Sequence, residues 1–86
     1  MRVLIPDPLR SYTEERRQVE ADGATLGEVL ADLDRRYPGI RFRMVDEQDR
    51  IRRHIRIFIN ADQVLDLARP LQASDDVVIV QALSGG

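Results

Sequence analysis

The chain has 86 residues, a formal net charge of −2 and no cysteine. This length fits one small domain, and the lack of thiols excludes disulfides, thiolate metal sites and a cysteine nucleophile. Because acidic and basic side chains are interspersed, the sequence has no footprint for nucleic acid, and no apolar run approaches the roughly 20 residues of a membrane span. The apolar N-terminal stretch is too short for a signal peptide, so we expect a cytoplasmic protein with no membrane partner.

The first part of the chain predicts two short strands. Residues 2–5 are β-prone and are stopped by Pro6 and Pro8, while alternation over residues 17–21 predicts the second strand. The stretch around residues 11–13 between them is a hairpin or a loop. Asp22-Gly23 then marks a turn.

A helix is predicted to start at the sequence Thr25-Leu26-Gly27-Glu28, which forms a capping box. In this motif the Thr25 hydroxyl accepts a hydrogen bond from the Glu28 amide, and the Glu28 side chain reaches back to the Thr25 amide. Apolar residues follow at helical spacing on one face, at Leu26, Val29, Leu30, Leu33 and Tyr37. Pro38-Gly39 ends the helix, and its apolar face requires a sheet to pack on.

The second half of the chain predicts three further strands. Residues 40–53 have no clear element and contain a polar loop at 46–50. Residues 55–59 alternate as a half-buried strand, residues 60–62 form a turn, and residues 63–65 form a short or edge strand. After a turn at residues 74–76, the run 77–80 is apolar on both faces, which is typical of a central strand.

The order strand, strand, helix, strand, short strand, strand predicts an α+β fold. A central last strand parallel to the first, with the helix crossing one face, is a compact arrangement. We therefore expect a β-grasp (ubiquitin-like) domain over residues 1–82, with a mixed four- to five-stranded sheet and one main helix on one face. Residues 83–86 are expected to form a flexible C-terminal tail.

The chain ends in Gly85-Gly86. Glycine has no Cβ, so this end is thin and flexible, and its one reactive group is the α-carboxylate. An ordinary frayed terminus is the alternative interpretation. A thin tail suits insertion into the narrow active site of another enzyme, with Leu83, Ser84 and Gly85 threading and Gly86 reacting.

Several segments resemble the MoaD/ThiS sulfur-carrier family. They are the helix region at 25–30 and 37–40, the segment 59–64, residues 69–71 with 75–80, and the end 82–86. The stretch 54–60, preceded by a polar insertion, is similar to the CysO-like branch, which serves cysteine biosynthesis.

This resemblance implies that the chain is a protein co-substrate and not an enzyme. An adenylating enzyme of the MoeB/ThiF type, related to ubiquitin-activating enzymes, would use ATP to adenylate the Gly86 carboxylate. A sulfur donor would then form a thiocarboxylate, which a sulfur-accepting synthase would use to make cysteine or another sulfur-containing metabolite. The carrier itself would bind no cofactor and no metal.

Three other functions share some of these features. The alternatives are the small subunit of molybdopterin synthase, a ubiquitin-like modifier joined to lysines through Gly86, and a β-grasp adaptor that binds partners without covalent chemistry. The modifier uses the same activation of the C-terminus, so the sequence hardly separates it from a sulfur carrier, whereas the synthase subunit would bind a large catalytic subunit stably.

A partner-docking face is predicted on the open side of the sheet. If Ile57 and Ile59 face the helix, then Phe58 and Arg56 point to the other side, where one face of Val78 and Val80 should also lie. An exposed apolar patch rimmed by arginine is typical of a protein-binding surface. The alternative is that residues 40–53 cover Phe58.

Two other features have weaker functional interpretations. His54 is the only histidine, and without cysteine it makes no metal site, so we expect a surface or strand-edge residue. Arg50, Arg52, Arg53 and Arg56 form a local basic run, which is either a solvated face or a contact for an acidic partner.

Overall fold

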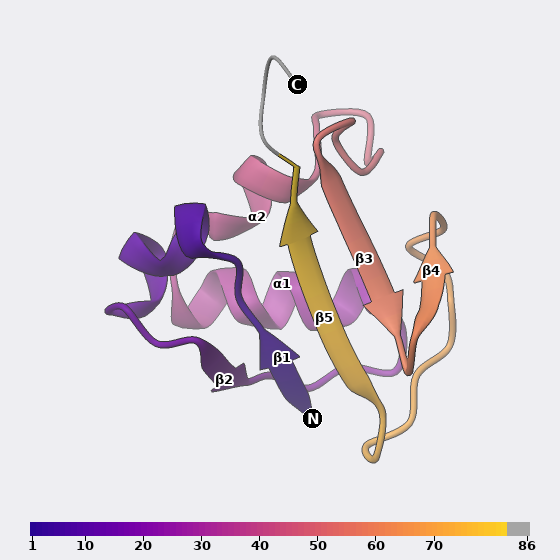
Figure 1. Ribbon diagram of the computed structural model, residues 1–86. Coiled ribbons are helices and arrows are strands. Elements are labelled where there is room, and N and C mark those ends of the chain that lie inside the picture. Colours follow the sequence, from indigo (N-terminus) through magenta and orange to yellow (C-terminus); the bar gives the residue numbers. More distant parts are fainter. Residues whose placement is uncertain (83–86) are drawn as a thin grey trace.

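The computed structural model describes residues 1–82, and these form one five-stranded sheet in the order β2-β1-β5-β3-β4 (Figure 1). The strands are β1 (Arg2–Leu4), β2 (Gln18–Glu20), β3 (Ile55–Ile59), β4 (Asp62–Val64) and β5 (Asp76–Gln81). β1 and β5 pair in parallel, and the other neighbouring strands pair antiparallel. The predicted mixed β-grasp sheet, with the last strand at its centre, is confirmed.

The main helix, α1 (Leu26–Arg36), crosses one face of this sheet. The Thr25 side chain accepts a hydrogen bond from the Glu28 amide at 3.2 Å, as the capping box predicts. The second half of that prediction is wrong, because Glu28 Oε1 accepts from the Ala24 amide at 3.1 Å. Tyr37 lies just past the helix as its C-cap and is half-buried against the core.

The core lies between α1 and the sheet and follows from the alternation in each strand. Val3, Ile57 and Val77 point to the helix side and are fully buried, as are Leu30 and Leu33 of α1. Burying one such side chain contributes about 1.5–3 kcal/mol. Because every second strand residue points inward, the residues between them necessarily form the opposite face.

Two helical segments fill connections that the sequence left open. The 3₁₀ segment η1 (Asp7–Thr13) follows β1, and the short helix α2 (Ile40–Met44) follows α1. α2 starts after Gly39, whose φ of 98° favours glycine, and it buries Ile40 and Met44 at a spacing of one helical turn. Asp34 Oδ1 accepts from the amides of Gly39 and Arg41, both at 3.1 Å, and so supports the start of α2. Within the described part of the chain, none of the helices is long and apolar enough to cross a membrane.

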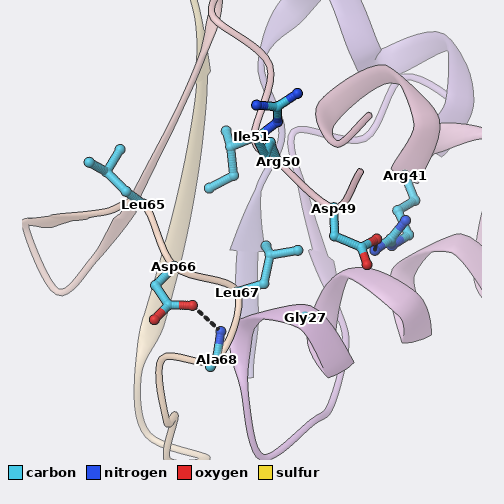
Figure 2. A pocket seen from close by; sticks show the side chains of 9 residues that line it. All are labelled: Gly27, Arg41, Asp49, Arg50, Ile51, Leu65, Asp66, Leu67 and Ala68. Carbon is cyan, nitrogen blue, oxygen red and sulfur yellow. Dashed lines mark hydrogen bonds and ion pairs between the residues drawn. The ribbon is translucent and has the colours of Figure 1, made fainter. Parts of the chain in front are cut away.

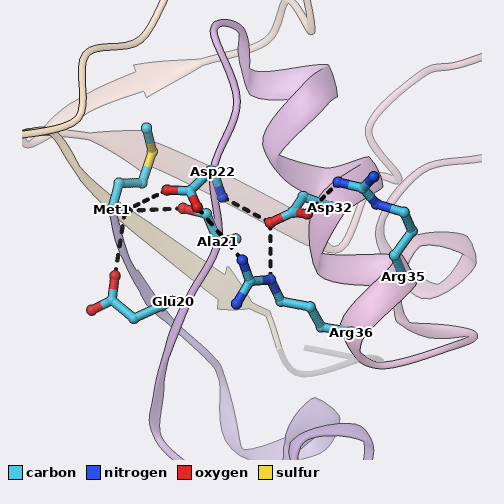
Figure 3. A network of polar contacts seen from close by, with 7 residues as sticks. All are labelled: Met1, Glu20, Ala21, Asp22, Asp32, Arg35 and Arg36. Carbon is cyan, nitrogen blue, oxygen red and sulfur yellow. Dashed lines mark hydrogen bonds and ion pairs between the residues drawn. The ribbon is translucent and has the colours of Figure 1, made fainter.

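A polar network connects the β1–β2 edge to α1 (Figure 3). Asp32 is buried and accepts hydrogen bonds from the Asp22 amide at 2.9 Å and from Arg36 Nε at 3.0 Å, and it also pairs with Arg35. The backbone hydrogen bond from Asp22, followed by the contacts with the two arginines, holds the pKa of Asp32 below its ordinary value. Asp32 is therefore a buried charge whose partners are all in place.

Candidate functional site

The C-terminal end of β5 is the structural base for the predicted reactive tail. β5 is hydrogen-bonded to β1 on one side and to β3 on the other. The Ala82 amide extends this pairing, since it donates to the His54 carbonyl oxygen at 2.7 Å. Ala82 is the last described residue, so the predicted threading residues Leu83, Ser84 and Gly85 and the predicted reactive residue Gly86 lie outside the described part.

The open face of the sheet brings the four predicted docking residues together. Phe58 is the register partner of Val78, and Arg56 is the register partner of Val80, all on the face opposite α1. Val80 is 41% exposed, while Phe58 and Val78 are half-buried. In Figure 1, α1 and α2 both lie behind the sheet, so neither helix covers this face.

Leu4 extends the same apolar surface and was missed by the sequence reasoning. Its register partner is Val78, and its side chain is 37% exposed. A groove of about 460 Å³ lies beside it, between the β1–η1 connection and β5, and it is also lined by Pro6, Pro8 and Val80. The signal was present in the alternation of the first strand, because Leu4 must point away from the core if Val3 points into it.

At the other end of β5, the acidic pair Asp75 and Asp76 serves the fold. Arg2 binds Asp76 with two hydrogen bonds of 3.1 Å, and this contact lowers the pKa of Asp76. Asn60 donates to Asp75 at 2.7 Å and accepts from the Asp76 amide at 3.0 Å. The pKa of Asp75 is lowered first by the Gln72 amide and then by Asn60. Within residues 1–82, no three His, Cys, Asp or Glu side chains converge as metal ligands.

A second hollow, of about 680 Å³, lies near the start of α1 (Figure 2). Its walls include Ile51, Leu67 and Leu65, and the Leu65 side chain is 78% exposed. An ion pair between Arg41 and Asp49, at 3.2 Å, lies at its edge. No residue of β5 lines this hollow, which separates it from the C-terminal end of the chain.

Comparison with known proteins gives the family. The ThiS family matches this chain over residues 3–86, which includes the diglycine. The chain belongs to the ThiS family. It is 36% identical to the sulfur carrier protein CysO of Mycobacterium tuberculosis over 89 aligned positions, which cover 98% of this chain and 96% of that protein.

Solved structures of such proteins superpose closely on this one. In the crystal structure of the Amycolatopsis orientalis BexX/CysO complex, the matching chain has a TM-score of 0.91 and 34% identity, with 99% of this chain and 98% of that chain covered. SAMP1 from Haloferax volcanii, a small archaeal modifier protein, has a TM-score of 0.79 and 25% identity, with 100% and 98% covered. The resemblance to the MoaD/ThiS family and its ubiquitin-like fold is confirmed.

Proposed function

We propose that this chain is a sulfur carrier that works through the carboxylate of Gly86. The match to the ThiS family over residues 3–86, diglycine included, is the observation that carries the proposal. The similarity to CysO favours cysteine biosynthesis as the pathway that consumes the sulfur. In this role the chain is a co-substrate, and ATP and the catalytic groups belong to its partner enzymes.

The proposed chemistry has two steps. A Gly86 carboxylate oxygen attacks the α-phosphorus of ATP, which releases pyrophosphate and forms an acyl-adenylate. A donor at the oxidation level of sulfide then attacks the acyl carbon, and AMP leaves as the thiocarboxylate forms. Activation is needed because a free carboxylate is a poor electrophile. Delivery of the sulfur on a tethered carrier then gives the last step a high effective concentration.

The base of the tail supports this role. β5 is paired on both sides, and the Ala82 amide is fixed at 2.7 Å from the His54 carbonyl oxygen, so the following residues start from a defined position. Four residues span at most roughly 13 Å when extended. A domain of this kind stays outside a recessed active site while Gly86 reaches into it.

We assign partner docking to the open face of the sheet, through Phe58, Arg56, Val78 and Val80. The support is that register brings these side chains together beside β5, with an apolar groove next to them. Aromatic and aliphatic groups with arginine are typical of interface centres.

The test uses intact mass. The chain is incubated with ATP, sulfide and the purified MoeB/ThiF-type adenylating enzyme of its own organism. We expect a product heavier by the difference between one sulfur and one oxygen, mapped to Gly86. One alanine added after Gly86 should abolish the product, whereas one alanine added before Met1 should not. Product formed with the C-terminal extension still in place would refute the proposal.

The similarity to SAMP1 favours a second candidate, a protein modifier conjugated through the same carboxylate. Both functions share the adenylation step, so only the fate of the activated carboxyl separates them. Gly86-linked adducts on other cellular proteins, together with a lack of thiocarboxylate in protein isolated from native cells, would replace the carrier by the modifier.

A further inference from the structure

A second surface flanks the end of β5, built from α2 and from the residues just before β3. We call this surface, made of Phe42, Arg43, Arg52, Arg53 and His54, the basic edge. The Phe42 side chain is 57% exposed, and the Arg52 guanidinium lies 4.6 Å from the centre of its ring. Phe42, Arg43, Arg52 and His54 together line a shallow hollow of about 220 Å³.

The basic edge is held in a fixed shape. Arg52 Nε donates to the Phe42 carbonyl oxygen at 2.7 Å, and the Arg52 amide donates to the Met44 carbonyl oxygen at 2.9 Å. These bonds connect the end of α2 to the start of β3, so the exposed ring and the guanidinium above it do not depend on a partner for their arrangement. Preorganised groups of this kind lose little conformational freedom on binding.

The basic edge lies where the tail begins. Its residue His54 accepts the hydrogen bond of the Ala82 amide, at 2.7 Å, which is the last described contact of the chain before residues 83–86. Figure 1 shows the same relation at the level of elements, because α2 and the start of β3 lie beside the tip of β5. Because the four residues after Ala82 span at most roughly 13 Å, an enzyme that receives Gly86 comes close to this surface.

Most of the charge of the basic edge has no ion-pair partner, although Arg52, after the amides of Arg50 and Gln48 and the charge of Arg50, contributes to the lowered pKa of Asp46. Arg43, Arg52 and Arg53 make no ion pair with another residue of the described range 1–82, and neither does the adjacent Arg56. Of the nine remaining arginines, six make ion pairs, and Arg16, Arg17 and Arg69 make none within the described range; the six are Arg2, Arg10, Arg35, Arg36, Arg41 and Arg50. Since the whole chain carries a net charge of −2, this cluster is a local excess of positive charge.

We propose that the basic edge binds an acidic protein surface at the rim of the adenylating enzyme's active site and so directs the tail into it. This inference rests on the proposed function. Charge complementarity of this kind raises association rates and fixes orientation, and it weakens as salt is added. A protein partner is favoured over nucleic acid because the net charge of the chain is negative and the cluster adjoins the reactive terminus.

The test measures ATP–pyrophosphate exchange by the purified adenylating enzyme of the same organism, at varied concentrations of the chain. The variant is Arg43→Glu with Arg53→Glu, since both side chains are exposed and neither donates a hydrogen bond within residues 1–82. We expect the chain concentration at half-maximal rate to rise roughly tenfold or more at low salt, with the maximal rate unchanged. The salt dependence seen with the wild type should shrink, and the double glutamine variant should be intermediate.

The matched control is Arg16→Glu with Arg17→Glu, which changes the net charge equally on exposed residues just before the edge strand β2. We expect this control to behave as the wild type, and thermal unfolding should show that both double variants stay folded. Equal effects of the two variants, or no effect of the basic-edge variant, would overturn the inference. Retention of single-stranded DNA that depends on Arg43 and Arg53 would also overturn it. A wild-type chain that supports no exchange would instead refute the proposed function itself.

Discussion

Asp32→Asn tests whether the buried carboxylate between α1 and the β1–β2 edge stabilises the fold as an ion. The Asp32 side chain is 10% exposed, and it accepts from the Asp22 amide, from Arg36 Nε and from Arg35. Asparagine keeps one acceptor oxygen for the Asp22 amide and Arg36 Nε, which share Oδ2, but it turns an NH₂ group toward Arg35 in place of Oδ1. Hydrogen bonds to a charged group contribute about 1.5–3 kcal/mol, so we expect a loss of about 2 kcal/mol in the free energy of unfolding.

The assays are urea unfolding and thermal unfolding of the wild type and the variant across pH. For a chain of this length, a loss of about 2 kcal/mol corresponds to a fall in Tm of roughly 8–16 °C. The pKa of folded Asp32 is below its ordinary value. Its stabilisation is therefore fully present above the unfolded pKa of about 3.9 and is lost as pH falls through the folded pKa. The difference between the two proteins should be constant near neutral pH and shrink in acid.

Asp62→Asn is the matched control, because Asp62 is exposed on the edge strand β4 and makes no ion pair with any residue of the described range. We expect it to change stability little at any pH. A stability of Asp32→Asn equal to that of the wild type at neutral pH would refute the reasoning. So would a gap between the two proteins that widens as the solution is acidified.

Three further substitutions test other parts of the structure. Asn60 has φ 48° and bonds to Asp75 and Asp76. Alanine and glycine both lose these bonds, but only glycine adopts a positive φ without cost, so the free energy of unfolding of Asn60→Ala in urea should be about 1 kcal/mol below that of Asn60→Gly. Equal stabilities would contradict this account. A Cβ at Gly23 would lie 2.6 Å from the Val29 amide nitrogen, so Gly23→Ala should lower the free energy of unfolding by about 1–3 kcal/mol in the same assay. A variant as stable as the wild type would show that the backbone at the start of α1 shifts to make room for the methyl group. Gly85→Val should fold normally but fail to support pyrophosphate exchange, and exchange at the wild-type rate would rule out threading through a narrow site.

Local patterns in the sequence determined most of the secondary structure. The α1 helix follows from the Thr25 cap and from apolar residues at helical spacing, and the strands follow from alternation, so each depends on neighbours within a few residues. The same alternation placed Phe58 and Arg56 on one face. The two helical segments η1 and α2 were missed because they are too short to show a period of their own and are stabilised by burial of single residues such as Leu9 and Ile40.

Only the tertiary structure decided which distant groups meet. The sequence identified a basic run and a C-terminal diglycine but gave no reason to place them together. The antiparallel register of β3 and β5 brings His54 to Ala82, and the bonds from Arg52 bring Phe42 and Arg43 of α2 to the same place. Such contacts join residues 8 to 28 positions apart, and no local pattern encodes them, because they depend on strand pairing and on the packing of α2 against the start of β3.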